Sequence, residues 1–353
     1  MSQTLDNLSG LLQRRGGAPL DRETLHEAER APWTFACVAL GLMLLSAVLV
    51  GWLPLQVSIA TVFLFAGPHN WMELRFFVSR MPVRWGESRG FFLTALAGVA
   101  LLTGFYASLP TLARLLGWEE AGWTTAQALW NCLLVCWVLA LVRLRSRERG
   151  GRDWSWTLPV GFALVGLSWM SPQLWALGLV YLHPLVALWF LDRQIQKSRP
   201  RWRVAYRLCV ACVPLCVAVL WWCLSSAPPL PADDALSLRI TQHAGAQILS
   251  GVSSHLLVST HVFLETLHYA VWLLAIPLVA MRRAAPWSTR RIPLVTHPRG
   301  WPRTVRTLLA ASAFVVLLLW VAFVADYPST RDLYFTVAML HVLAEAPFLL
   351  RML

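Results

Sequence analysis

Long apolar runs separated by short polar connections dominate the pattern of positions along this chain. A run of about 20 apolar residues is long enough for an α-helix to cross a bilayer. The pattern predicts ten such helices, near 33–53, 55–79, 90–115, 122–143, 155–170, 173–191, 205–226, 255–281, 304–325 and 331–350. The mixed polarity of 237–252 predicts an interfacial helix before the eighth span. We therefore expect an all-α, polytopic membrane helical bundle.

Composition supports a membrane protein, because 57% of the residues are hydrophobic and only 14% are charged. A polar segment, residues 1–32, precedes the first apolar run and lacks a signal-peptide pattern, so we expect that run to remain as an anchor. No composition shift marks a second soluble domain. The expected organisation is thus a cytoplasmic segment (1–32) and a single transmembrane domain (33–353).

Basic residues gather in alternate connections between the predicted spans. The N-terminal segment and the connections 80–89, 143–152, 193–207 and 282–306 are rich in arginine. All but three of the 30 Lys and Arg residues fall on this side; the exceptions are Arg114, Arg239 and Arg331. The positive-inside rule then places both termini in the cytoplasm, with the chain as a multi-pass protein of the cell inner (plasma) membrane. The net charge of +12 is explained by orientation and contact with anionic lipid, so we expect no nucleic-acid partner.

Every glutamate inside a predicted span follows a histidine by four positions. The pairs are His69/Glu73, His261/Glu265 and His341/Glu345. Positions i and i+4 share a helix face, and ionisable groups are costly in hydrocarbon. Imidazole together with carboxylate is the ligand set of zinc, manganese and non-haem iron. The pattern therefore predicts a metal site buried within the membrane.

Helix rise predicts that these ligands meet near the bilayer midplane. At 1.5 Å per residue, His69, His183 and His341 lie roughly 15 Å from the cytoplasmic end of their spans, and His268 about 20 Å. Glu265 and His268 also have the Glu-x-x-His spacing of di-iron helical bundles. Prolines 68, 184 and 347 lie beside the ligands and predict local helix breaks that line a cavity. The predicted metal ligands are His69, Glu73, His183, His261, Glu265, His268, His341 and Glu345.

Iron is the metal that best matches this ligand set. Three carboxylates and several imidazoles exceed the needs of one tetrahedral zinc, and they suit one or two non-haem iron ions with open positions. Zinc, manganese and haem remain alternatives, although haem ligation does not explain the glutamates. The His-Glu-x-x-His pattern of zinc proteases is absent from the sequence. Cys209, Cys212 and Cys216 share a helix face, which is more typical of close helix packing than of a soft-metal site.

Two short motifs resemble a known family of membrane oxygenases. Gly67-Pro68-His69 is similar to the Pro-His motif of the Brp/Blh-type membrane β-carotene 15,15'-dioxygenases, and His341-x-x-x-Glu345-x-Pro347 loosely resembles their C-terminal histidine region. The chain departs from that family after His69, where Asn70, Trp71 and Glu73 replace the expected Gly and Asp. The resemblance implies a polytopic fold, iron held by histidines on several helices, and His69 and His341 as the matched iron ligands.

The leading hypothesis is a non-haem iron oxygenase or oxidoreductase that acts on an apolar small molecule, such as an isoprenoid, a carotenoid or an acyl chain. Such a substrate would reach a midplane metal from the membrane lipid. The reaction could also involve an electron-transfer partner. Other hypotheses remain open. The His/Glu pairs are also compatible with a proton- or divalent-metal-coupled transporter, with a haem-binding electron-transfer protein, and with simple helix–helix packing.

Overall fold

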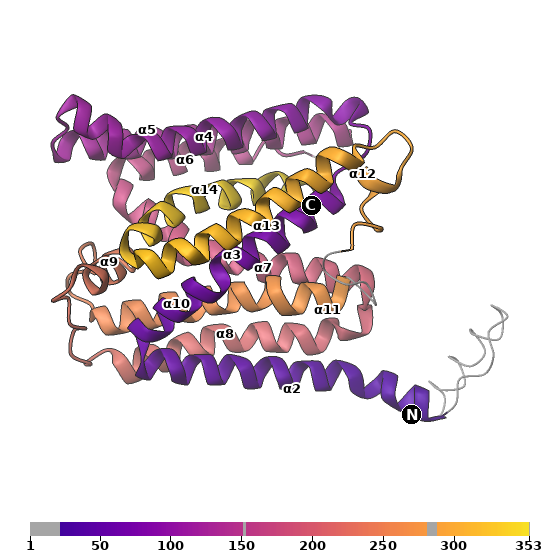
Figure 1. Cartoon of the computed structure of the whole chain (residues 1–353), viewed down its shortest axis with the longest axis horizontal. Helices are drawn as coiled ribbons and strands as arrows, with labels where there is room; N and C mark the ends of the chain where they lie inside the picture. Colours follow the sequence, from indigo (N-terminus) through magenta and orange to yellow (C-terminus); the bar gives the residue numbers. More distant parts are fainter. Residues whose placement is uncertain (1–21, 151–152, 281–287, 353) are drawn as a thin grey trace.

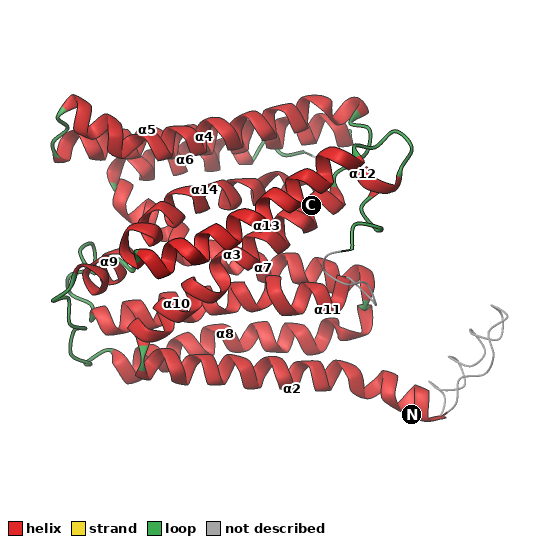
Figure 2. Ribbon diagram, viewed as in Figure 1, coloured by secondary structure: helices red, strands yellow, loops and turns green. Residues whose placement is uncertain are grey.

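Helices are the only regular secondary structure in the described part of the chain. The computed structural model describes residues 22–150, 153–280 and 288–352, and within these ranges it contains no β-strand (Figure 2). The first predicted helix begins earlier than expected, at Arg22 rather than near residue 33. Most of the predicted N-terminal segment, residues 1–21, lies outside the described residues, as does the 282–287 part of the longest basic connection.

Each predicted span coincides with a helix or a helical series. The long helices are α2 (Arg22–Trp52), α3 (Pro54–Arg80), α4 (Arg89–Leu116), α5 (Glu120–Arg149), α7 (Pro172–Ser198), α8 (Arg203–Leu224), α13 (Pro302–Ala325) and α14 (Tyr327–Met352). The shorter elements are η1 (Gly86–Ser88), α6 (Thr157–Met170), η2 (Pro200–Trp202), α9 (Ala235–His243) and α12 (Pro293–Thr296). The eighth predicted span is divided into α10 (Ser254–Ala270), a π-helical segment η3 (Val271–Ala275) and α11 (Ile276–Ala280).

The protein is a multi-pass membrane protein by the length and composition of its helices. Among the described residues, eight helical segments are long and apolar enough to cross a membrane. The segments that contain α3 and α6, both predicted as spans, are not among the eight. Helix α6 has only 14 residues, and α3 carries Glu73, Arg75 and Arg80. Polar side chains inside a membrane protein need protein neighbours, and α3 indeed packs between α10, α13 and α14.

Neighbouring helices in the sequence largely alternate in direction and form layers (Figure 1). Helices α4, α5 and α6 pack together along one side, while α2, α8 and α10 pack along the other. Helices α3, α7, α13 and α14 lie between these groups, and α14 contacts α3, α4 and α7. The four helices that carry the predicted ligands, α3, α7, α10 and α14, thus meet inside the bundle, where protein and not lipid surrounds their polar residues.

The two ends of the bundle differ in charge and in the contacts that close them. At the basic end, Arg80 donates a hydrogen bond to Gln194, and Arg145 donates to the Arg351 carbonyl at 3.4 Å. The opposite end contains α9, which lies in the stretch expected to form an interfacial helix, although the helix ends at His243 and turns follow it. We refer to this end as the α9 end. Because α2 begins and α14 ends at the basic end, the described chain enters and leaves on the same side (Figure 1).

Candidate metal centre

Six of the predicted ligands converge from four helices. Helix α3 supplies His69 and Glu73, α7 supplies His183, α10 supplies His268, and α14 supplies His341 and Glu345. They form two overlapping groups in which one ligand atom of each residue lies within 4.8 Å of the others: His69, Glu73, His268 and His341; and His183, His268 and Glu345. His268 belongs to both groups, so the six side chains form one centre.

Short distances between the imidazoles define the middle of this centre. The Nε2 atoms of His183 and His341 are 3.2 Å apart. The ring of His268 lies 4.7 Å from that of His183 and 5.3 Å from that of His69, between centroids. Facing imidazole nitrogens at such a distance either share a proton or direct their lone pairs at a common cation. The second arrangement is what a metal ligand set requires.

Neighbouring groups fix the orientation of two of the imidazoles. The Nδ1–H of His69 has the Phe65 carbonyl oxygen at 3.0 Å as its acceptor, which leaves the lone pair on Nε2. His183 is oriented by Glu345, whose Oε2 lies 3.1 Å from His183 Nδ1, so that His183 Nε2 faces His341. A backbone carbonyl or carboxylate behind the second ring nitrogen is the usual support of a metal-bound histidine.

Several buried polar atoms of the centre have no hydrogen-bond partner. Buried polar groups are nearly always paired, so an unpaired cluster needs an explanation. The unpartnered atoms are His69 Nε2, both oxygens of Glu73, both ring nitrogens of His268, His341 Nδ1 and Glu345 Oε1. Each neutral imidazole offers one nitrogen lone pair, and each carboxylate offers oxygen lone pairs. One ligand atom from each residue of a group lies within 4.8 Å of the others, so a bound cation would pair with these lone pairs, whereas the remaining N–H of His268 would stay without a protein partner.

The remaining two predicted ligands, His261 and Glu265, belong to neither group. Both lie on α10, closer to the α9 end than His268. At 1.5 Å per residue, Glu265 is about one turn (roughly 4.5 Å) from His268 and His261 about two turns (roughly 10 Å). Glu265 accepts a hydrogen bond from the Tyr269 hydroxyl at 2.6 Å. His261 packs its ring 5.1 Å from that of His243. The stripe of His261, Glu265 and His268 therefore faces the interior of the bundle, but only His268 is close enough to the other ligands to belong to the metal centre.

Two tyrosines and two asparagines around the centre and its cavity were not predicted from the sequence. Tyr269 lies 4.5 Å from His69 between ring centroids, and Asn70 donates to the Tyr334 hydroxyl at 3.4 Å. Tyr334 precedes His341 by seven positions, a spacing that shares one helix face and would have identified it. Asn131, a polar residue in the middle of an apolar run, gave a similar signal.

His243, on the α9 side of the centre, is held in its uncharged form by its surroundings. Enclosure by protein lowers the pKa of His243 well below its usual range, and the nearby His261 and Arg331 contribute to the same effect. His243 is therefore a neutral imidazole at pH 7. It is a hydrogen-bonding group that adds no charge to the approach to the centre.

An aromatic layer closes the centre on its basic side. Phe76, Phe77, Phe190 and Trp272 follow the ligands of α3, α7 and α10 by one or two helical turns toward the basic end. Phe76 and Trp272 lie 5.4 Å apart between ring centroids, and Phe77 and Phe190 5.9 Å. Trp272 belongs to the π-helical segment η3, a deviation that is frequent near functional sites because it re-aims side chains within a helix.

A polar cavity reaches the centre from the opposite side. It has a volume of about 480 Å³, and its inner wall includes His69, His183, His268 and His341. Toward the α9 end its wall includes the buried Asn131, then His261 and His243, and finally the exposed glutamines of its mouth. We call this cavity the vestibule.

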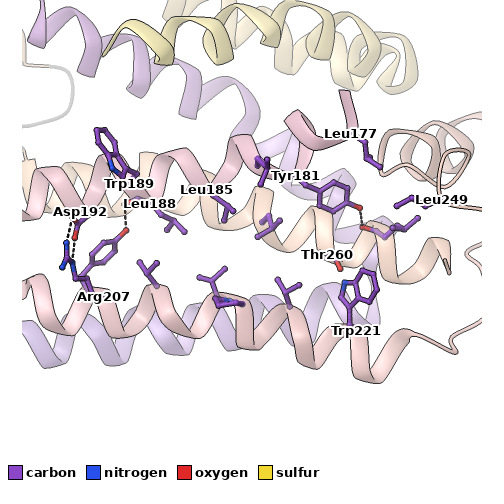
Figure 3. A pocket seen from close by; sticks show the side chains of 18 residues that line it. Leu177, Tyr181, Leu185, Leu188, Trp189, Asp192, Arg207, Trp221, Leu249 and Thr260 are labelled. Carbon is purple, nitrogen blue, oxygen red and sulfur yellow. Dashed lines mark hydrogen bonds and ion pairs between the residues drawn. The ribbon is translucent and has the colours of Figure 1, made fainter. Parts of the chain in front are cut away.

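An apolar groove lies on the other face of α7. It has a volume of about 930 Å³ and runs between α7 and α8, with walls of leucine, valine and aromatic side chains (Figure 3). At its basic end, Arg207 donates to Asp192 at 3.0 Å, and Tyr206 donates to the Leu188 carbonyl at 2.6 Å. Leu177 contributes to both the groove and the vestibule. We call this feature the α7–α8 groove.

The arrangement combines a buried set of His and Glu donors, a hydrophilic approach from one end and an apolar surface open to lipid. It can hold a cation in a protein cage and bring a reactant to it. A scan of protein-family models, a search of curated proteins and a search of solved structures each found no match to this chain.

Proposed function

We propose that this protein is an integral-membrane metalloenzyme with a non-haem iron centre of one or two ions. The observation that carries the proposal is the cluster of unpartnered donor atoms inside the bundle. His69, His268 and His341 supply imidazole nitrogens, and Glu73 supplies a carboxylate to the same point. Removing such groups from water without a partner is costly, and a bound cation offsets that cost.

The donor types favour iron over the alternative metals. Four imidazoles and two carboxylates are more than a tetrahedral zinc needs, and the mixture suits iron with positions left open for a reactant. Bound iron would supply activation of dioxygen. The residues of this chain hold the ion, orient the imidazoles through Phe65 and Glu345, and exclude water from the basic side through the aromatic layer.

We further propose an oxygenase or oxidoreductase reaction on a lipid-like molecule such as an isoprenoid, a carotenoid or an acyl chain. Two observations support it. His69 and His341, which match the motifs of the Brp/Blh-type dioxygenases, have rings 5.2 Å apart in the same centre. The α7–α8 groove offers an apolar surface beside the helix that carries His183. A redox partner that restores the iron would act at a surface of the protein.

The orientation in the membrane follows from the charges. We propose ten spans, with the basic end in the cytoplasm and the α9 end on the outer side of the plasma membrane. The support is the gathering of arginines at the end where α2 begins and α14 ends, which fits the positive-inside rule for a multi-pass protein.

A second candidate function is a proton- or divalent-cation-coupled transporter. The vestibule favours it, because a polar approach to a buried His/Glu cluster is also what a conducting protein requires. The aromatic layer on the basic side makes that approach one-sided in this structure, which agrees better with a resident metal than with a passage.

Metal analysis with an absorption spectrum of freshly purified protein in detergent tests the proposal. We expect one or two iron ions per chain and no Soret band. A Soret band would replace the proposal with haem-based electron transfer, and zinc alone would favour hydrolytic or transport chemistry. A folded protein that binds none of these metals would contradict the metalloenzyme proposal as a whole.

A further inference from the structure

The mouth of the vestibule is lined by neutral amides. Gln173 lies near the start of α7, Gln242 is in α9, and Gln247 is in the turns that follow it; all three side chains are exposed. Gln127 of α5 adds a fourth amide to the wall. Amide groups both donate and accept hydrogen bonds without carrying charge. This surface can therefore replace the hydration of a neutral polar molecule as it enters.

Asn131 marks the inner part of the vestibule with an unused donor. Its side chain is 1% exposed, it lines the cavity, and its Nδ2 has no hydrogen-bond partner. A buried amide donor without a partner is destabilising, because it has lost its hydration and gained no hydrogen bond. A ligand oxygen that accepts from Nδ2 would remove that cost. Asn131 and His183 both contribute to the wall of this cavity, so the accepting oxygen would be held within the space that reaches the metal centre.

Few charged groups line the vestibule. Among its lining residues, none is Lys, Arg or Asp, and the single carboxylate outside the metal groups is Glu265, which accepts from Tyr269 through Oε1 while its Oε2 has no hydrogen-bond partner. An anion therefore meets no lining side chain of opposite charge, and a cation meets one carboxylate, so the loss of hydration is costly for a charged ligand. A neutral ligand with a hydroxyl or carbonyl oxygen avoids that cost and meets amide, hydroxyl and imidazole groups set among apolar side chains.

We propose that the vestibule is a substrate site that takes uncharged, oxygen-bearing molecules from the α9 end and binds their hydroxyl or carbonyl oxygen at Asn131 Nδ2, beside the metal centre. The assignment of this molecule as the substrate rests on the proposed iron chemistry, whereas the access route and its preference for neutral molecules do not. For a lipid-like substrate, the group bound here is its neutral polar end.

Cysteine accessibility in a variant without the seven native cysteines tests the route. Asn131→Cys probes the inner vestibule, Gln247→Cys its mouth, and Ser259→Cys is the matched control, because Ser259 of α10 is fully buried but hydrogen-bonds to the Val50 carbonyl away from the cavity. The probes are the neutral methyl methanethiosulfonate and a trimethylammonium-ethyl methanethiosulfonate that does not cross membranes. Should Asn131→Cys fail to fold, Ala338→Cys on α14 lines the same cavity and replaces it.

We expect the neutral reagent to modify Asn131→Cys at least tenfold faster than Ser259→Cys. The charged reagent should modify Gln247→Cys only from the α9 side of oriented vesicles, and the ratio of neutral to charged rates should be at least tenfold larger at Asn131 than at Gln247. Equal reactivity of Asn131→Cys and Ser259→Cys would overturn the route. Equal rate ratios at the two vestibule positions would overturn the preference for neutral molecules.

Metal content measured on the same preparations separates this inference from the proposed function. A reactive Asn131→Cys in a protein that binds no metal would keep the vestibule and remove the enzyme proposal. An unreactive position in a protein with its full iron content would do the reverse.

Discussion

Helix α7 separates two cavities of opposite chemistry. On one face, His183 and Pro184 line the vestibule, where imidazoles, amides and tyrosines face the interior. On the other face, Leu182 and Leu185 line the α7–α8 groove, where the polar groups are confined mainly to its ends (Figure 3). Successive residues of a helix point in directions about 100° apart, so a few positions suffice to move from one environment to the other.

The comparison shows where a membrane protein can place polar and apolar side chains. Costly groups are placed where protein surrounds them on all sides, and apolar side chains are left where lipid can reach them. Helices α3 and α13 show the same difference. Helix α3 buries His69, Glu73 and Arg75, whereas α13 buries only Val305, Leu309 and Phe323 and exposes most of its apolar length.

The largest expected effect comes from removing the ligand shared by both groups of the metal centre. His268→Ala should lower iron affinity at least about 100-fold, because even the loss of an outer partner of a ligand costs 10–100-fold. Iron per chain after dialysis against a chelator measures this. His255→Ala is the control, because His255 is on the same helix and pairs with the Gly51 carbonyl. Full iron content in His268→Ala would contradict the assignment of the metal centre that lies on the vestibule side of α7.

A tenfold effect is expected from filling the apolar side. Leu185→Trp places a large ring in the α7–α8 groove, and it should weaken retention of a bound acyl or prenyl lipid about tenfold, equivalent to roughly 1.4 kcal/mol. Native mass spectrometry during stepwise delipidation measures the retention, and the iron content should not change. Leu215→Trp, an exposed position of α8 that does not line the groove, is the matched control. Equal lipid retention in both variants would show that the groove has no particular occupant.

The positions of the helices were largely predictable, because an apolar run of about 20 residues is long enough to mark a whole helix. Every predicted span falls on a helix, since a helix satisfies the backbone hydrogen bonds of a long apolar segment within that segment. The interruption at η3 was not predicted, because all five residues from Val271 to Ala275 are apolar and a change of helical period leaves no mark in a uniformly apolar segment. The division of α10 from α11 depends on how Trp272 packs among aromatic rings of other helices.

The clustering of six candidate ligands could be predicted from the sequence, but the extent of the cluster could not. Spacing of four within a helix identified the pairs of α3 and α14, and the common depth identified His183 and His268. Both signals are local to one helix. How many residues of α10 reach the centre depends on the angle at which α10 crosses the other helices. In this structure His268 reaches it, whereas His261 and Glu265 do not. Asn131 was missed because its role depends on a cavity formed by other helices.

A smaller effect is expected in α9, the helix that contributes Gln242 to the mouth of the vestibule. Asp234 caps α9 by accepting from the backbone N–H groups of Leu236 and Ser237. The hydrogen bond from the Ser237 hydroxyl, together with these backbone bonds, lowers the pKa of Asp234. Asp234→Ala should raise amide exchange in the first turn of α9 about fivefold at pH 7. The neighbouring Asp233→Ala should not.

The same cap gives a pH dependence with a definite sign. A carboxyl whose pKa is lower in the folded state contributes stability above its unfolded pKa, and that contribution is lost as the pH falls through the folded value. The difference in α9 exchange between the native protein and Asp234→Ala should therefore shrink on acidification below about pH 4. A difference that is independent of pH over this range would assign the effect to packing instead of the charged cap.

The smallest effect, and the sharpest complement to His268→Ala, is expected for Glu265→Gln. The sequence pattern alone groups Glu265 with His268 as ligands, whereas the structure pairs Glu265 with Tyr269 and leaves it outside both metal groups. Glutamine keeps an oxygen that accepts from the Tyr269 hydroxyl and nearly the same volume, so iron content should change less than about twofold. Glu73→Gln is the matched comparison on α3, and it should lose iron because both Glu73 oxygens face the centre without a partner. Equal loss of iron in the two variants would show that Glu265 is also a ligand and that the metal centre extends toward the α9 end. The inner vestibule would then be part of the metal site and not only the approach to it.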